Sequence, residues 1–416
     1  MTNTKSGGIH YAWWIMVACC AMYGGAVGVI GNTMGLFLNP VMEEMEWTRL
    51  QASYYMSISG IVLAICQPIA GKLFSKIDIR ILLGCAVGVL CLSYAASSQF
   101  HSLAAWNAFG IIIGVCNAFL FYLPIPILMN SWFKDRLGLA LGIAVAFSSI
   151  TAAFANPIGN MLIAEYGWRT TRLIFGGIVF VAVMPFMLFV VRRTPEEKGL
   201  KPYGVEKMSA QQVAASAGEA TGATFKQALM SVSFWCYFLM ACLIVTCASM
   251  HVQTPGYAAW KGLGSQIGAT AVSVIMIGGI SGKIFLGWLN DKIGIVKTGM
   301  FAMVLGIIGS VIAVVSNMNV TLFFVGTFMF GVAYAALTIV PPLLVRSAFG
   351  MKSYSQIFSI ITFGLGIFGG TVAPMLYAKL YDAHKSFAIH WPLVAGMFAA
   401  ALVLLIIGNA TSKKAY

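Results

Sequence analysis

Apolar runs of about 20 residues recur along nearly the whole chain, and a helix of that length crosses the ~30 Å hydrocarbon core of a bilayer. Backbone polar groups find no water in that core, so such a chain is restricted to a bundle of spanning helices. The composition agrees, since 60% of the residues are hydrophobic and 9% are charged. We predict an all-α membrane protein with twelve transmembrane helices. The predicted spans lie near residues 11–38, 48–71, 80–97, 102–130, 137–161, 170–191, 228–258, 265–289, 296–316, 320–345, 354–379 and 388–410.

The positions of the basic residues predict how these helices are oriented. If both termini lie on the same side of the membrane, that side holds most of the lysines and arginines that give the chain its net charge of +13. They are Lys5, Lys72, Lys76, Arg80, Lys134, Arg136, Arg192, Arg193, Lys198, Lys201, Lys207, Lys226, Lys292, Lys297, Arg346, Lys352, Lys413 and Lys414. The other side holds Arg49, Arg169, Arg172, Lys261, Lys379 and Lys385. Bases are enriched on the cytoplasmic side, so we expect cytoplasmic termini, a plasma-membrane location and no nucleic-acid partner.

A polar stretch separates two halves that share a repeat. Residues 192–226 form a predicted cytoplasmic linker between six-helix bundles at 1–191 and 227–416. A shift of 216 residues aligns parts of the two halves, and repeats of this kind surround a central cavity that permits alternating access. We therefore expect two pseudo-symmetric bundles. The aligned pairs are Gly71 with Gly287, Lys76 with Lys292 and Gln67 with Lys283.

The repeated turns resemble those of the major facilitator superfamily, and the resemblance covers essentially the full chain. The second turn contains Gly287, Asp291, Lys292 and Gly294. The first turn contains Gly71, Lys76 and Asp78, with Ser75 where the acid is expected. The resemblance implies that these turns form cytoplasmic gates between the bundles.

Further motifs resemble the monocarboxylate porter and oxalate:formate antiporter branch of that superfamily. They are YAWWIMVA in the first span, EWTR before the second, His251 ahead of a Pro and a Tyr, and TPEEKGLKPYG in the linker. The branch carries a substrate-binding arginine on its eighth helix, at the place of Lys283. Its oxalate-specific members add a lysine on helix 11, where this chain has Thr362. The resemblance therefore implies a monocarboxylate rather than a dicarboxylate substrate.

Lys283 is the main candidate site residue, because an ionisable side chain inside a span is costly and usually functional. All twelve acidic residues fall in predicted loops or at helix ends, so none is placed to pair with it. It could bind a substrate carboxylate, or it could extend toward Asp291 at the cytoplasmic interface. Further candidates are His251, Tyr122, Tyr334, Asn32 and Gln67. Each of these could bind substrate or simply pack at a helix interface.

These features predict a secondary transporter of a small organic anion, such as lactate or pyruvate, moved with a proton or by exchange. An oxalate/formate-like exchanger is the alternative within transport, and a non-transporting membrane sensor is the alternative outside it. The sequence carries no P-loop, catalytic triad or metal-ligand cluster, so we expect no enzyme activity, cofactor or metal. The expected partners are the carboxylate, protons and the lipid bilayer, and the chain is expected to be monomeric.

Overall fold

The computed structural model describes residues 9–207 and 222–412, and it is built from helices. Lys5, Lys413 and Lys414, which entered the orientation argument, lie outside the described residues. The first group of helices is α1 (Tyr11–Tyr23), α2 (Leu38–Met45), α3 (Arg49–Lys76), α4 (Ile79–Ala96), α5 (Leu103–Leu120), α6 (Pro124–Trp132) and α7 (Leu137–Pro185). The second group is α9 (Phe225–Met230), α10 (Val232–Ala248), α11 (Met250–Trp260), α12 (Ser265–Ile293), α13 (Ile295–Val315), α14 (Val320–Tyr334), α15 (Ala336–Phe349), α16 (Tyr354–Ile367), α17 (Ala373–His384) and α18 (His390–Ser412).

The predicted multi-pass membrane fold is confirmed. Within the described residues, 10 helical runs are long and apolar enough to cross a bilayer, and the pair α10 and α11, bent by 40° at their junction, makes eleven if it counts as one span. The 54-residue run Leu137–Val190 contains two helices, because Gly167 has a non-helical backbone with φ 78°. Counting that run as two spans agrees with the twelve that the apolar runs predict. Glycine suits Gly167 because it adopts positive φ without steric cost.

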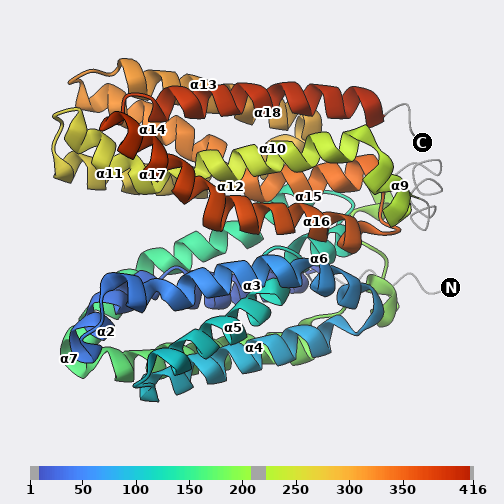
Figure 1. The fold of residues 1–416 in the computed structure, drawn as a ribbon. Helices are drawn as coiled ribbons and strands as arrows, with labels where there is room; N and C mark the ends of the chain where they lie inside the picture. Colours follow the sequence, from blue (N-terminus) through green and yellow to red (C-terminus); the bar gives the residue numbers. More distant parts are fainter. Residues whose placement is uncertain (1–8, 208–221, 413–416) are drawn as a thin grey trace.

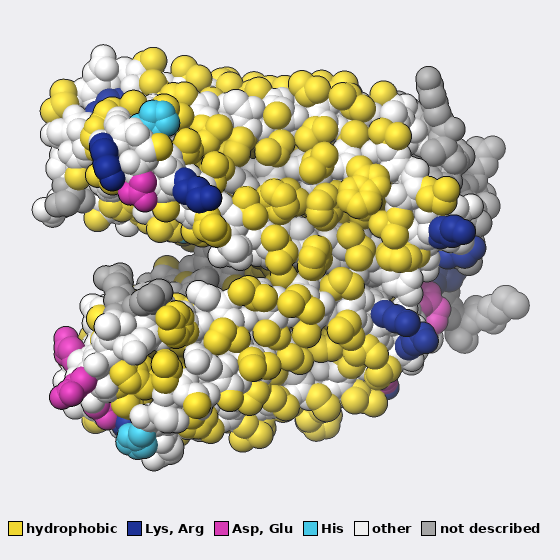
Figure 2. Space-filling view, viewed as in Figure 1, with side chains coloured by type: hydrophobic (Ala, Val, Ile, Leu, Met, Phe, Trp, Pro, Cys, Tyr) yellow, Lys and Arg dark blue, Asp and Glu magenta, His cyan; other side chains and the backbone are white. Residues whose placement is uncertain are grey.

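The helices form two bundles that lie side by side (Figure 1). The bundles touch near the end at which α1 begins and α18 ends, which we call the terminal end, and a cleft separates them at the opposite end (Figure 2). Hydrophobic side chains cover much of the visible face, whereas charged side chains gather at the two ends (Figure 2). This distribution suits a protein whose middle lies in lipid and whose ends lie in water.

Close backbone packing holds the bundles together near the terminal end. The contacts run along α7 with α12 and along α3 with α16. A Cβ atom on Gly138 would collide with the carbonyl of Gly287, and a Cβ on Gly71 would lie 2.5 Å from the Ser359 side chain. Small residues at these crossings let the backbones approach closely, as in membrane helix interfaces generally. We call these two lines of contact the seams.

The described ends of the linker attach to different bundles. The backbone N–H of Tyr203 donates to the Trp132 carbonyl at 2.8 Å, and the N–H of Lys134 donates to the Tyr203 carbonyl at 2.9 Å. The N–H of Ala223 donates to the Phe349 carbonyl at 3.0 Å. The linker therefore begins against the first bundle and ends against the second. The division into domains at 192–226 stays a prediction.

Arg172, one of the bases assigned to the side opposite the termini, does not face water. Its side chain is fully buried within the first bundle. The guanidinium carbon lies 4.5 Å from the centroid of the Trp106 ring and 4.8 Å from that of Phe37, and Nη1 donates to Ser97 Oγ at 2.6 Å. A planar guanidinium stacks well on aromatic faces. The sequence did not reveal this burial because the rings come from separate helices and loops.

Several spans are interrupted where they pass the space between the bundles. The α-helical pattern gives way to π-helix at Gly24–Gly31 and Phe368–Val372. It breaks between α5 and α6, at Ser249 between α10 and α11, and at Ala335 between α14 and α15. Irregular backbone at membrane depth is tolerated where it is buried in protein or lines a cavity, and π-helical turns are frequent at functional sites. The interruptions are therefore consistent with a functional cavity between the bundles.

Candidate functional site

The cavity between the bundles consists of two adjoining chambers. The larger has a volume of about 700 Å³, and we call it the lysine chamber because Lys283 lines it. The smaller has a volume of about 290 Å³, and we call it the apolar chamber. Both chambers are lined by Phe121, Tyr122, His251, Tyr334 and Leu337, which form the waist between them.

Lys283 supplies the cation of the lysine chamber. It lies on α12 and is only 5% exposed. Its Nζ donates to Ser149 Oγ at 2.9 Å and to the Val145 carbonyl at 3.4 Å, both on α7. Among the described residues, no carboxylate forms an ion pair with it. A buried cation that meets only neutral acceptors is poorly compensated, so an anion entering the chamber would be stabilised there.

The alternative contact between Lys283 and Asp291 is not formed. The Asp291 carboxylate accepts hydrogen bonds from the backbone N–H groups of Gly138 at 2.7 Å and Leu139 at 2.8 Å. Those groups belong to the first turn of α7, whose N–H groups have no partners within the helix. Asp291 therefore caps a helix of the opposite bundle, and Lys283 faces the cavity instead.

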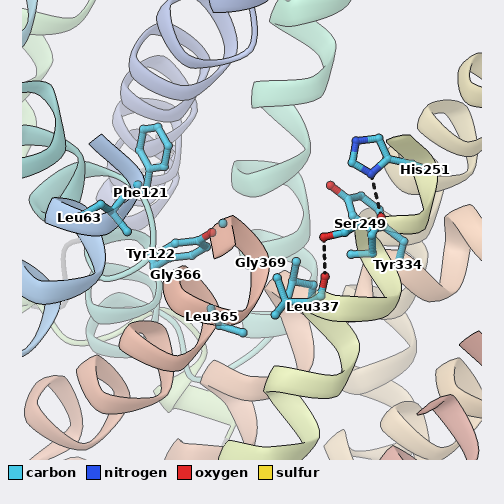
Figure 3. Close-up of a pocket in the computed structure, with 14 residues that line it drawn as sticks. Leu63, Phe121, Tyr122, Ser249, His251, Tyr334, Leu337, Leu365, Gly366 and Gly369 are labelled. Carbon is cyan, nitrogen blue, oxygen red and sulfur yellow. Dashed lines mark hydrogen bonds between the residues drawn. The ribbon is translucent and has the colours of Figure 1, made fainter. Parts of the chain in front are cut away.

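His251 lies at the waist, two residues after the break at Ser249. Its Nδ1 lies 2.7 Å from the Ala248 carbonyl oxygen (Figure 3). A carbonyl can only accept, so Nδ1 must carry a proton, and the neutral ring keeps Nε2 as an acceptor. The imidazole centroid is 6.2 Å from that of Tyr334. The histidine is therefore part of the cavity wall rather than a cap at the outer end of its helix.

The predicted aromatic residues flank the waist from different bundles. Tyr122 lies in the break between α5 and α6, and Tyr334 is the last residue of α14. In Figure 3, Tyr122 and Phe121 lie on one side of the chamber and Tyr334 lies on the other. The rings narrow the passage while their hydroxyl groups offer polar contacts. The helix breaks direct both tyrosines toward the cavity.

Asn32 and Gln67, the two predicted amides, have different locations. Asn32 follows the π-helical segment of the first span and lines the lysine chamber. Gln67 is fully buried in the seam between α3 and α16, where its Oε1 accepts from Thr362 Oγ1 at 2.9 Å. Gln67 is not among the residues that line either chamber. The repeat partner of Lys283 thus makes a neutral contact between the bundles.

Sequence reasoning missed a polar face on α7 and a third tyrosine. The missed polar residues that line the lysine chamber are Tyr23, Ser148, Ser149, Asn156, Ser273 and Thr338. Ser149 and Asn156 are seven residues apart, so they lie on the same face of the helix. Polar residues at that spacing in an otherwise apolar span were a signal that could have identified this wall. Tyr23 precedes the π-helical segment, and nothing in its spacing distinguishes it.

The second glycine and acid turn links the bundles, whereas the acid of the first turn acts locally. Gly294 ends α12 with φ 82°, which favours glycine, and Lys292 next to Asp291 is exposed. Lys76 ends α3, and Asp78 caps α4 while its carboxylate pairs with Arg80 at 2.6 Å. The hydrogen-bonded Arg80 guanidinium holds the pKa of Asp78 below its usual range.

Asp291→Asn is expected to weaken the closure of the terminal end. An amide keeps an acceptor for the α7 backbone but loses the charge that favours a helix N-terminus, an effect of about 1 kcal/mol. That is roughly a fivefold shift toward states in which α7 and α12 separate. The measurement is maleimide labelling of Val145→Cys, a position 4% exposed beside the seam, in a cysteine-free background.

Asp78→Asn is the matched control, because Asp78 bonds within its own bundle. Its labelling rate should equal that of the parent protein. Equal labelling of the Asp291 and Asp78 variants would show that the Asp291 contact contributes nothing to closure.

Comparisons with known proteins agree with this architecture. The sequence profile of the Major Facilitator Superfamily matches residues 13–374. The chain is 21% identical to the uncharacterised MFS-type transporter YhjX of Escherichia coli, over 80% of each chain. It is 23% identical to human monocarboxylate transporter 12, over 70% of this chain and 59% of that protein, and 23% identical to the Escherichia coli sialic acid transporter NanX, over 89% and 87%.

Solved structures show the same fold. The proton:xylose symporter XylE superimposes with a TM-score of 0.74 at 13% identity, covering 95% of each chain. FucP, solved in an outward conformation, superimposes with a TM-score of 0.69 at 14% identity, covering 96% of this chain and 99% of that one. At these identities the likeness concerns architecture alone.

Proposed function

The chain belongs to the Major Facilitator Superfamily and is a secondary transporter rather than an enzyme, and we propose that its cargo is a small organic anion, most simply a monocarboxylate. The observation that carries the proposal is Lys283, a buried cation that lines the central cavity and contacts only neutral acceptors. A carboxylate would complete its charge pairing and accept strong, charge-assisted hydrogen bonds.

The number of cations in the cavity favours one carboxylate over two. Among the described residues that line the chambers, Lys283 is the only lysine or arginine. Thr362, at the position where a second cation would serve a dicarboxylate, is buried against Gln67 in a seam. A second carboxylate would enter the cavity without a charged partner, and that desolvation opposes an oxalate-like substrate.

Two of the relatives carry names that fit an anionic cargo. One is a monocarboxylate transporter and another transports sialic acid. Both relatives are 23% identical to this chain, so their names support the class of cargo and not its identity.

We place the terminal end in the cytoplasm, because most lysines and arginines lie on that side. The structure then has its cavity open to the outside and its seams closed toward the cytoplasm. Transport would require the seams to separate and the outer cleft to close around the bound anion. His251 could take part in proton coupling, since its Nε2 accepts when neutral and donates when protonated.

Uptake by proteoliposomes tests the proposal directly. Radiolabelled acetate, lactate, pyruvate and oxalate would be offered with and without an acidic exterior. We expect saturable uptake of the monocarboxylates and little of oxalate. Stimulation by external acid would indicate proton symport, and stimulation by internal unlabelled carboxylate would indicate exchange. Saturable binding without flux would favour the sensor, and an absence of both would refute the proposal.

A further inference from the structure

We propose that the apolar chamber is a subsite for a bulky, mainly apolar group, such as an aromatic ring or a branched chain, that the substrate carries apart from its carboxylate. The inference rests on the proposed function, because Lys283 in the neighbouring chamber would hold the anionic end. The two chambers meet at the waist, so one molecule could reach from the lysine into the apolar chamber.

The lining of the apolar chamber suits such a group. Beyond the waist residues, no charged side chain is among the described lining residues, and the walls consist of Leu63, Val245, Ala248, Ser249, Leu365 and four glycines. Figure 3 shows Leu63 and Leu365 at the chamber with Gly366 and Gly369. Apolar carbon and bare backbone pack well against a flat ring or a branched chain and give little to a charged or highly hydrated group.

The volume of the apolar chamber favours a carboxylate larger than acetate or lactate as the preferred cargo. A volume of about 290 Å³ corresponds to roughly ten water molecules, at ~30 Å³ each. A small acid bound at Lys283 would leave that water trapped beside apolar walls when the cleft closes. Ordered water needs two to four polar partners. Beyond the waist, Ser249 is the only polar side chain among the described lining residues, and its hydroxyl already donates to the Val245 carbonyl at 3.2 Å. A larger substrate would displace the water and bury its own apolar surface instead.

Two of the glycines that line the apolar chamber are not required by the packing of neighbouring helices. A Cβ atom on Gly60 of α3 or on Gly370 would meet no atom within 4 Å. At Gly366 and Gly369, by contrast, a Cβ would lie 2.7 Å from Ala64 and from Val245. Glycine is a poor helix former, so its presence within α3 at Gly60 is unfavourable to the helix itself. The missing side chains leave space that a substrate group can occupy.

The test compares a small and a bulky 2-oxo acid, pyruvate and phenylpyruvate, as substrates in proteoliposomes. Wild-type protein should prefer phenylpyruvate by at least about tenfold in half-saturating concentration, since each extra buried carbon group is worth roughly tenfold or more. Gly60→Leu and Gly370→Leu should remove that preference while changing pyruvate uptake less than about threefold. Gly396→Leu is the control, because that exposed position in α18 also has no atom within 4 Å of a Cβ and does not line the chamber.

The possible outcomes distinguish a failure of the subsite proposal from a failure of the proposed function. If both acids depend on Lys283 but the Gly60 and Gly370 variants affect them equally, the subsite is refuted and the carboxylate function stands. A wild-type preference for pyruvate would also refute the subsite. If neither acid is bound or transported, the proposed function fails. Unchanged thermal melting of the variants would exclude misfolding as the cause of any change in selectivity.

Discussion

Lys283→Ala is expected to abolish carboxylate uptake, with initial rates in proteoliposomes falling by at least about 100-fold. Removing one member of a buried charge pair costs roughly 3 kcal/mol or more, and each 1.4 kcal/mol is a factor of ten. The substrate carboxylate would then enter a chamber whose remaining described lining offers only neutral groups. Among the described lining residues Lys283 is the only lysine or arginine, so no other permanently charged side chain there can replace it.

Two further variants separate this effect from a folding defect. Lys283→Met keeps most of the side-chain volume and removes a poorly compensated buried charge, so its melting temperature should be unchanged or higher while transport is lost. Lys283→Arg keeps the charge in a different, planar geometry and should retain part of the activity. Uptake at the wild-type rate in the alanine variant would remove the central role of Lys283.

Gly138→Val is expected to reduce uptake by tenfold or more, because the seam between α7 and α12 has no room for a side chain. A Cβ at Gly138 would collide with the carbonyl of Gly287 and lie within 2.8 Å of Asp291. Overpacking of this kind costs about 1–3 kcal/mol, which is a shift of roughly five- to 100-fold away from the closed seam. A transporter that cannot close one side cannot complete its cycle.

Gly177→Val is the matched control for this steric argument. Gly177 lies in α7 as well, and a Cβ there would meet no atom within 4 Å. The Gly177→Val variant has the same change of residue type in a helix, but its new side chain does not enter a seam. Its uptake rate should therefore stay within about twofold of the wild-type rate. Similar losses in both variants would mean that helix propensity, rather than the seam, limits transport.

The seams join the proposed binding site to the proposed gate. Lys283 contributes its carbonyl to the close approach with Gly142 on α7, and its Nζ bonds to Ser149 on the same helix. Asp291, further along α12, caps the start of α7. An anion that draws the Lys283 ammonium away from Ser149 would therefore loosen the same helix pair that must separate.

The membrane fold and the presence of a lysine inside a span were predictable from the sequence. Long apolar runs are a local property of the chain, and they restrict it to spanning helices whatever the rest of the fold does. Lys283 was recognisable because a cation is costly inside a span, and the predicted span, residues 265–289, contains no acid. The candidates Tyr122, Tyr334, His251 and Asn32 also lie around the cavity.

The partners of these residues were decided by the tertiary structure. Ser149 is 134 positions from Lys283, and Gly138 is 153 positions from Asp291, so no local pattern pairs them. The place of Gln67 in a seam likewise depended on which helix packs beside α3. Periodicity along one helix shows which residues share a face, but not which helix that face meets.

The sequence by itself therefore determined a bundle of membrane-spanning helices with one lysine inside a span, because both are recognised from the cost of polar groups in hydrocarbon. Only the tertiary structure decided that this cation lines a cavity, that Asp291 caps a helix of the other bundle, and that an apolar chamber adjoins the site. Those features depend on how distant helices pack against each other, and close packing is set by the shapes of both surfaces together.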